Sequence, residues 1–139
     1  MRFIRKATTE TVLLEDGFLW SDEFAWKPID QNQEYSVDGT LIVQEGKKKS
    51  GRPITLLSKT EKQGWVKRPA LSKLQDWSAL QDEHFTLVFE YPHDNRQFNV
   101  IFNHQDGAIE AEPVRGVPTV SEGDFYRATF RFLEVPNAS

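Results

Sequence analysis

The chain has 139 residues, the usual size of a single domain, and we expect residues 1–139 to form one. Its formal net charge of −4 argues against a general nucleic-acid-binding protein, because such domains are usually basic. The chain contains no cysteine, which excludes disulfides, cysteine-ligated metals and thiol catalysis. The 10 Phe, 4 Trp and 3 Tyr residues can supply a hydrophobic core, so the composition indicates a folded protein and not a disordered acidic tail.

The sequence shows neither a signal peptide nor a transmembrane segment. Its first six residues include three basic ones, but they run into Ala7–Glu10 without the apolar stretch that a signal peptide requires. The longest unbroken apolar runs are three residues, such as Val12–Leu14, whereas about 18 are needed to span a bilayer. We therefore expect a soluble protein made in a reducing cytoplasm, with no membrane partner.

The first half of the chain predicts short strands. Arg2–Lys6 and Thr11–Glu15 are the earliest candidates. Tyr35–Val37 and Thr40–Gln44 flank Asp38-Gly39, a dipeptide that favours a two-residue hairpin turn because glycine adopts positive φ without steric cost. These segments indicate β-structure from the start of the chain.

A second hairpin is predicted around the basic run of residues 46–52. Pro53–Lys59 reads as the strand that follows this run. The pattern pairs Leu41 and Val43 with Ile54 and Leu56, so that the hairpin of residues 41–57 projects as a long arm with residues 47–52 at its tip.

One helix interrupts the β-pattern. Pro69 suits a helix start, because its missing N–H would have no intrahelical partner there. The apolar side chains that follow share one broad arc at helical spacing: Ala70, Leu71, Leu74, Trp77 and Leu80. We expect this arc to lie on a sheet.

Strict alternation returns in the second half, where antiparallel, half-buried strands are predicted over residues 85–91, 97–103, 108–114 and 125–133. In the last of these, Tyr126, Ala128, Phe130 and Phe132 form the buried face. The fold class predicted is α+β and mainly β: an antiparallel β-sandwich or split barrel with one packed α-helix and a long projecting β-hairpin.

The sequence contains few residues arranged like a catalytic or metal-binding motif. The histidines His84, His93 and His104 fall at a strand start and at two turns, without the spacing of a metal site. No serine stands in a nucleophile-elbow motif, and the carboxylate pairs lie at turns and element ends. We therefore predict no catalytic residue, no cofactor and no metal, and a protein that is not an enzyme.

Two groups of residues suggest contacts with partners. Lys47, Lys48, Lys49 and Arg52 form the one basic cluster; it reads either as a solvated hairpin tip or as an arm that docks on an acidic partner, and another copy of this acidic chain qualifies. Trp20 and Trp26 flank a polar segment and are predicted to face a partner. The alternative is a small carbohydrate-binding β-sandwich that presents Trp20, Trp26 or Trp65.

The order of these segments resembles a known family. Residues 35–46 (YSVDGTLIVQEG) and 51–56 (GRPITL), followed by Trp65, the helix from Pro69 and the later strands, are similar to the ring-forming domain of distal tail proteins of long-tailed bacteriophages and prophages. The resemblance covers residues 33–135. It rests on the order of the predicted strands and helix and on these short sequence segments.

The resemblance implies a structural role in a virion. Members of this family form hexameric rings that join the tail tube to the baseplate hub. We therefore expect self-association, tail-tube and hub partners, and a location at the tail tip after synthesis in the bacterial cytoplasm. DNA would pass through the ring without specific binding, which the net charge of −4 suits. The hairpin of residues 41–57, including Leu41, Ile54 and the basic cluster, is predicted to cross a subunit boundary. A tail-tube or tail-terminator subunit is the alternative within the same class.

Overall fold

The computed structural model describes residues 1–14, 18–58, 65–92, 94–114 and 125–136. Its elements follow one another in chain order: β1 (Arg2–Arg5), β2 (Thr11–Leu13), β3 (Phe18–Trp20), β4 (Ile29–Tyr35), β5 (Leu41–Lys47), β6 (Pro53–Ser58), β7 (Trp65–Lys67), α1 (Arg68–Ser78), β8 (Phe85–Val88), β9 (Gln97–Phe102), the 3₁₀ turn η1 (His104–Asp106), β10 (Ile109–Pro113) and β11 (Phe125–Glu134). Nine of the strands form one sheet, and β4 and β5 form a second one by themselves.

The last strand, β11, organises the main sheet. Along the path β2-β1-β8-β9-β11-β6-β3 it lies between β9 and β6, and β7 and β10 pair with its first half. All of these pairings are antiparallel. The residues of β11 alternate between half-buried and buried positions, as the sequence predicted, and only its last two residues are both half-buried. The buried side chains along the whole strand therefore face the same core.

Aromatic rings fill this core. Phe3 has no exposed surface, and its ring centroid lies 4.9 Å from that of Phe85 and 5.0 Å from that of Phe132. From α1, Leu74 and Trp77 are buried in the same cluster, and the helix contacts β2 and β7. The predicted helix is therefore confirmed, with Pro69 in its first turn. Leu80, which was placed on the same arc, lies beyond the last helical residue and is 40% exposed.

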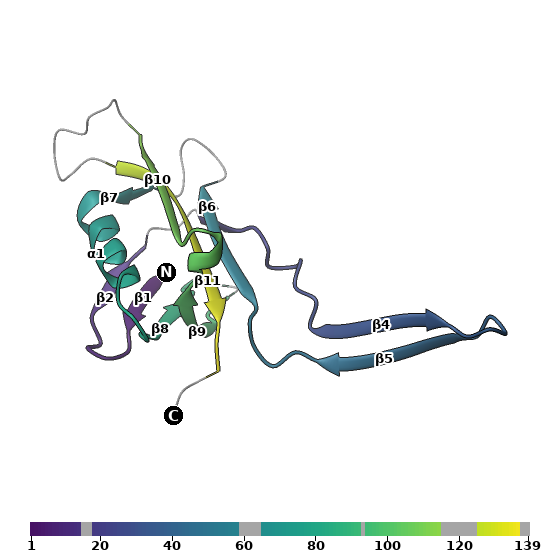
Figure 1. The fold of residues 1–139 in the computed structure, drawn as a ribbon. Helices are drawn as coiled ribbons and strands as arrows, with labels where there is room; N and C mark the ends of the chain where they lie inside the picture. Colours follow the sequence, from purple (N-terminus) through teal and green to yellow (C-terminus); the bar gives the residue numbers. More distant parts are fainter. Residues whose placement is uncertain (15–17, 59–64, 93, 115–124, 137–139) are drawn as a thin grey trace.

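The fold class is mainly β, with antiparallel sheets, one α-helix and a separate hairpin, as predicted. Within the described residues the main sheet does not close into a barrel. The hairpin of β4 and β5 extends away from the rest of the molecule, which we call the body (Figure 1). Residues 29–47, which form this hairpin and its turn, are called the arm below.

The structure corrects which segments form the arm. Leu41 and Val43 pair with Tyr35 and Gln33, and not with the strand of Ile54. The Asp38-Gly39 turn therefore stands at the tip, and the lysine run lies at the opposite end, the base. The physical reason is burial: Ile54 and Leu56 have no exposed surface and pair with Phe132 and Phe130 of β11 in the core. The predicted partners thus belong to the body.

Candidate functional site: the arm and its base

The arm is an isolated two-stranded hairpin. Its strands pair over seven positions, from Ile29 opposite Lys47 to Tyr35 opposite Leu41, and every residue in both strands is exposed. Within the described part of the chain, neither strand pairs with a third one. A two-stranded hairpin is at best marginally stable in water unless something packs on it. The arm therefore has the form of an element that a partner completes.

The two faces of the arm differ. Cross-strand partners share a face, and alternate residues of a strand lie on opposite faces. One face carries Ile29, Gln31, Gln33 and Tyr35 of β4 with Leu41, Val43, Glu45 and Lys47 of β5. The apolar side chains on it gather toward the tip, where Tyr35 is 75% exposed and Val37, in the turn, is fully exposed. The other face carries Asp30, Asn32 and Glu34 and is mostly polar.

The tip is a structured, negatively charged turn. Gly39 has a φ of 86°, and its N–H donates to the carbonyl oxygen of Ser36 at 2.9 Å. The Asp38 carboxylate accepts hydrogen bonds from the Ser36 hydroxyl and from the Thr40 N–H, the latter at 3.0 Å. These hydrogen bonds, first that from Ser36, lower the pKa of Asp38 below its usual value. The tip therefore keeps its negative charge at neutral pH.

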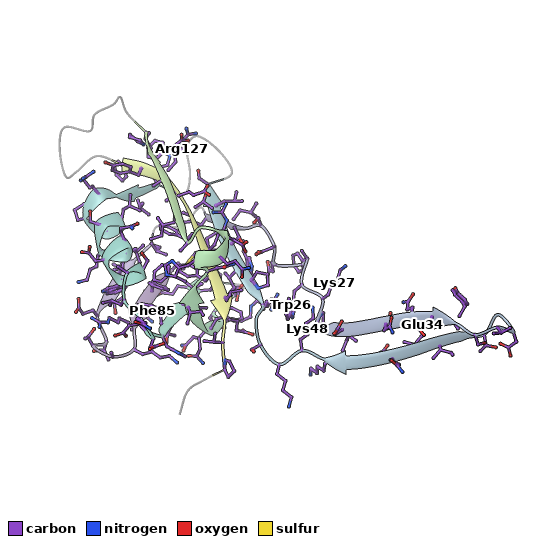
Figure 2. All side chains as sticks on the ribbon, in the orientation of Figure 1. Trp26, Lys27, Glu34, Lys48, Phe85 and Arg127 are labelled. Atoms are coloured by element: carbon purple, nitrogen blue, oxygen red, sulfur yellow. The ribbon has the colours of Figure 1, made fainter. Side chains whose placement is uncertain are left out.

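The base of the arm is basic and concave. Lys27 precedes β4, and Lys47, Lys48 and Lys49 end β5 and follow it. The Lys48 ammonium lies 4.8 Å from the centroid of the Trp26 ring, and the Lys48 N–H donates to the Pro28 carbonyl oxygen at 2.8 Å. A cavity of about 610 Å³ opens here between Trp26, Lys48 and the first residues of β4. Figure 2 shows Trp26, Lys27 and Lys48 together at the base, with Glu34 far along the arm.

The base lysines are without ion pairs in the described part of the chain. Among the residues that the structure describes, none of the ammonium groups of Lys27, Lys47, Lys48 and Lys49 forms a salt bridge. The cations of the body are arranged differently, since Arg5, Arg96, Arg127 and Arg131 each pair with a carboxylate. The base is therefore a concentration of positive charge that no ion pair among the described residues neutralises.

Three residues predicted to contact partners are used by the body instead. Trp20 is 7% exposed, and its ring stacks on Phe89 with centroids 5.5 Å apart. The Arg52 guanidinium lies 4.6 Å from the centroid of the Trp20 ring and donates to the Glu23 carbonyl oxygen at 2.8 Å. Ile54 is fully buried. The expectations that Trp20 and Ile54 face a partner are thus wrong, and Arg52 is held against the body. Partner contacts of Leu41, Trp26 and the three lysines remain predictions.

Two of the most exposed apolar residues, Phe24 and Val37, were not predicted as contact residues from the sequence. Phe24 is 93% exposed and lines a cavity of about 410 Å³ with Glu23, Asn95 and Arg96, and Val37 stands at the arm tip. The signal available in the sequence was a large apolar residue inside a polar turn segment, which indicates an apolar side chain on the surface and not in the core.

The histidines do not build a metal site in the part of the chain that the structure describes. His84 and His104 line one cavity of about 300 Å³ with Asp82 and Glu83, but no cluster of three side chains suitable for a metal is found among the described residues. His93 lies outside those residues. Trp65 is half-buried against Phe125, with ring centroids 5.7 Å apart. Over the same residues, no helix is long and apolar enough to cross a membrane.

Comparison of the chain with protein-family models, with curated proteins and with solved structures finds no match. Its function is therefore argued from the arm and its base. Among the described residues, the arm is the most exposed apolar element, and its base holds the most concentrated unpaired positive charge. The apolar side chains gather toward the tip, at the end of the hairpin opposite the base.

Proposed function

We propose that this chain is a structural subunit that assembles with copies of itself into a ring through its arm. The ring would belong to the tail tip of a long-tailed bacteriophage or prophage, where it would join the tail tube to the baseplate hub. The observation that carries the proposal is the isolated arm, whose apolar side chains are left uncovered by the described residues of the chain. The resemblance of residues 33–135 to ring-forming tail domains supports the identity of the assembly.

Self-association accounts for the exposed edges and apolar side chains of the arm. A hairpin with two unpaired edges and exposed Tyr35, Leu41 and Val43 would promote uncontrolled association unless a defined surface receives it. A closed ring gives every subunit the same contact and leaves no arm uncovered. Because the arm contributes nothing to the buried core, its length is best understood as reach toward a neighbour.

The remaining features of the proposal follow from the ring. A tail-tube protein would contact one face and hub proteins the other, and the virion would be the location of the protein. The net charge of −4 per subunit would favour the passage of DNA without specific binding. A tail-tube or tail-terminator subunit would use the arm in the same way. The carbohydrate-binding alternative loses one of its three tryptophans, because Trp20 is buried.

The test compares the wild-type chain with a variant whose arm is shortened in register. Deleting residues 31–34 and 42–45 removes four opposite pairs and keeps the turn, so the remaining pairs stay on their original faces. We expect light scattering and negative-stain images to show wild-type rings near six times 16.1 kDa and a folded, monomeric variant with an unchanged melting temperature. Rings formed by the shortened chain, or a wild-type chain that stays monomeric at every concentration, would contradict the proposal.

A further inference from the structure

We propose that the tip of the arm docks on the lysine-rich base of the arm in the next copy of the chain. This inference rests on the proposed self-assembly and names the two surfaces that meet. The tip surface consists of Glu34, Tyr35, Val37 and Asp38. The base surface consists of Trp26, Lys27, Lys47, Lys48 and Lys49, together with the cavity beside Trp26.

The first argument is the separation of charge along the arm. The outer part, residues 34–42, contains Glu34 and Asp38 and no cation. The base surface contains four lysines, and Asp30 also lines its cavity, so its net charge is positive. Glu45 lies between these ends, and its carboxylate accepts a hydrogen bond from the Gln31 amide at 2.7 Å. Opposite ends of one element thus carry net charge of opposite sign, which is the pattern expected of two complementary contact surfaces.

The second argument is that one chain cannot bring its own ends together. The strand from Ile29 to Tyr35 is continuously paired, so at the usual rise the tip stands roughly 20 Å from the base. This separation exceeds the distance of about 8–10 Å over which exposed charges interact at moderate ionic strength. The tip of one copy can therefore neutralise the base of another copy, and not its own.

The third argument concerns shape and apolar contact. Val37 is fully exposed and Tyr35 is 75% exposed, so the tip offers an apolar projection beside its carboxylates. The base offers a cavity of about 610 Å³ whose lining combines Trp26 and Pro28 with Lys27, Lys48 and one acidic residue, Asp30. An apolar projection with acidic flanks matches a concave aromatic site with basic flanks.

The geometry also selects the symmetry of the contact. A tip-to-tip contact would place two acidic turns together, and a base-to-base contact would place eight lysines together, so both two-fold arrangements are disfavoured. A tip-to-base contact is heterologous: each copy gives one tip and receives another. Contacts of this kind generate rings when the rotation closes.

Charge reversal tests the contact. The tip variant carries Glu34→Lys and Asp38→Asn, and asparagine preserves the acceptor oxygen of the turn; the base variant carries Lys27→Glu, Lys48→Glu and Lys49→Glu. We expect each variant alone to lose assembly, because like charges then meet at every contact. Mixed in equal amounts, they should restore it, since each tip then faces a base of opposite charge. Such rings alternate strictly and must contain an even number of subunits.

A chain that combines all five substitutions supplies the matched control. Its tip is basic and its base acidic, so we expect it to assemble without a partner variant. Normal rings from either single-surface variant, or failure of both the mixture and the combined chain, would overturn the docking inference. If shortening the arm nevertheless abolished assembly, the proposed ring would stand and the receiving surface would lie elsewhere.

Disulfide trapping provides a second readout that also detects weak association. The natural chain has no cysteine, so Val37→Cys and Lys49→Cys introduce the sole thiols of two single-cysteine variants. Mixed under mild oxidation, they should give a 37–49 heterodimer in large excess over either homodimer. Leu13→Cys, at a body position that is 71% exposed, controls for random collision. A 37–49 yield no higher than the 37–13 yield would overturn the inference.

Discussion

Phe3 shows how closely the core of this small protein depends on single rings. Its side chain has no exposed surface and contacts the rings of Phe85, Phe102, Phe132 and Trp77. We expect Phe3→Ala to lower the free energy of unfolding by about 3–5 kcal/mol, because it removes a buried ring and leaves a cavity. Chemical denaturation followed by tryptophan fluorescence measures this loss.

Phe24→Ala is the matched control for Phe3→Ala. The Phe24 ring is 93% exposed, so the same substitution should change the free energy of unfolding by less than about 0.5 kcal/mol. Phe3→Leu, which retains most of the buried volume, covers the case in which Phe3→Ala does not fold, and it should lose less stability. Equal losses for Phe3→Ala and Phe24→Ala would contradict the described core.

Gly39 fixes the turn through its backbone conformation. Its φ of 86° is unfavourable for other residues, although no atom lies within 4 Å of the position of an added Cβ. Gly39→Ala should therefore cost about 1–2 kcal/mol by backbone strain alone. The loss is confined to the arm, so we expect amide exchange in the arm, at Ser36 for example, to accelerate roughly tenfold while the melting temperature of the body stays constant.

Gly46→Ala supplies the comparison for Gly39→Ala. Gly46 also has open space around it, but its φ lies outside the left-handed region. In a strand, alanine is favoured over glycine by roughly 0.5–1 kcal/mol, so exchange in the arm should slow or stay unchanged. Slower exchange in Gly39→Ala would show that the turn does not have the described conformation.

At the scale of elements, an ion pair joins β1 to the segment before β8. Arg5 Nη2 donates to Glu83 Oε1 at 2.8 Å, and both side chains are about four-fifths buried. This hydrogen bond from Arg5 lowers the pKa of Glu83. A carboxyl with a lowered pKa stabilises the fold fully above its unfolded pKa of about 4.3, and this contribution is lost as the pH falls through the folded value.

In Glu83→Gln, the melting temperature should therefore fall less steeply between neutral and acidic pH than in the wild type. The wild type and variant should converge as the pH falls through the lowered folded pKa of Glu83, whereas above pH 5 the wild type should have the higher melting temperature. Glu112→Gln makes the same change in the more exposed Glu112–Arg127 pair, and it should leave the melting temperature at acidic pH nearly unchanged. Melting curves by circular dichroism across pH 3–7 provide the measurement. A constant difference between wild type and Glu83→Gln at all pH values would contradict the linkage.

The elements themselves were largely predictable, because local signals specify them. Alternation identified β11 and its buried face, Pro69 identified the start of α1, and Asp38-Gly39 identified the hairpin turn. The partner of β5 was not identified correctly. Leu41 and Ile54 have the same alternating pattern, but only the complete sheet shows that Ile54 pairs with Phe132, about 80 positions later. Pairing between distant strands depends on tertiary packing that local patterns do not contain.

The candidate site was partly predictable for the same reason. The lysine cluster was visible in the sequence, but its place at the base of the arm depended on the strand pairing. Trp20 and Trp26 looked equivalent beside a polar segment, yet Trp20 stacks on Phe89 in the body while Trp26 meets Lys48 at the base. Burial of a tryptophan is decided by residues far away in sequence, such as Phe89.

At the scale of the whole molecule, the charges that sum to −4 are unevenly distributed. Positive charge gathers at the base of the arm and negative charge at its tip, while most arginines of the body are paired locally. Long-range electrostatics should therefore act mainly on association, and only slightly on the folding of the body. Salt separates these two effects, because it screens exposed charges far more than buried contacts.

Assembly should consequently weaken as salt rises, whereas the melting temperature of the short-arm monomer should change little. The range over which exposed charges interact falls from about 10 Å at 0.1 M salt to about 3 Å at 1 M, which removes most of the attraction between tip and base. Sedimentation velocity at increasing sodium chloride concentrations measures the assembled fraction. The chain with both surfaces reversed has the same complementarity with opposite signs, so its assembly should fall in parallel. Assembly that strengthens with salt in both chains would mean that the apolar face around Leu41 and Val43, and not the charge pairing, holds the subunits together.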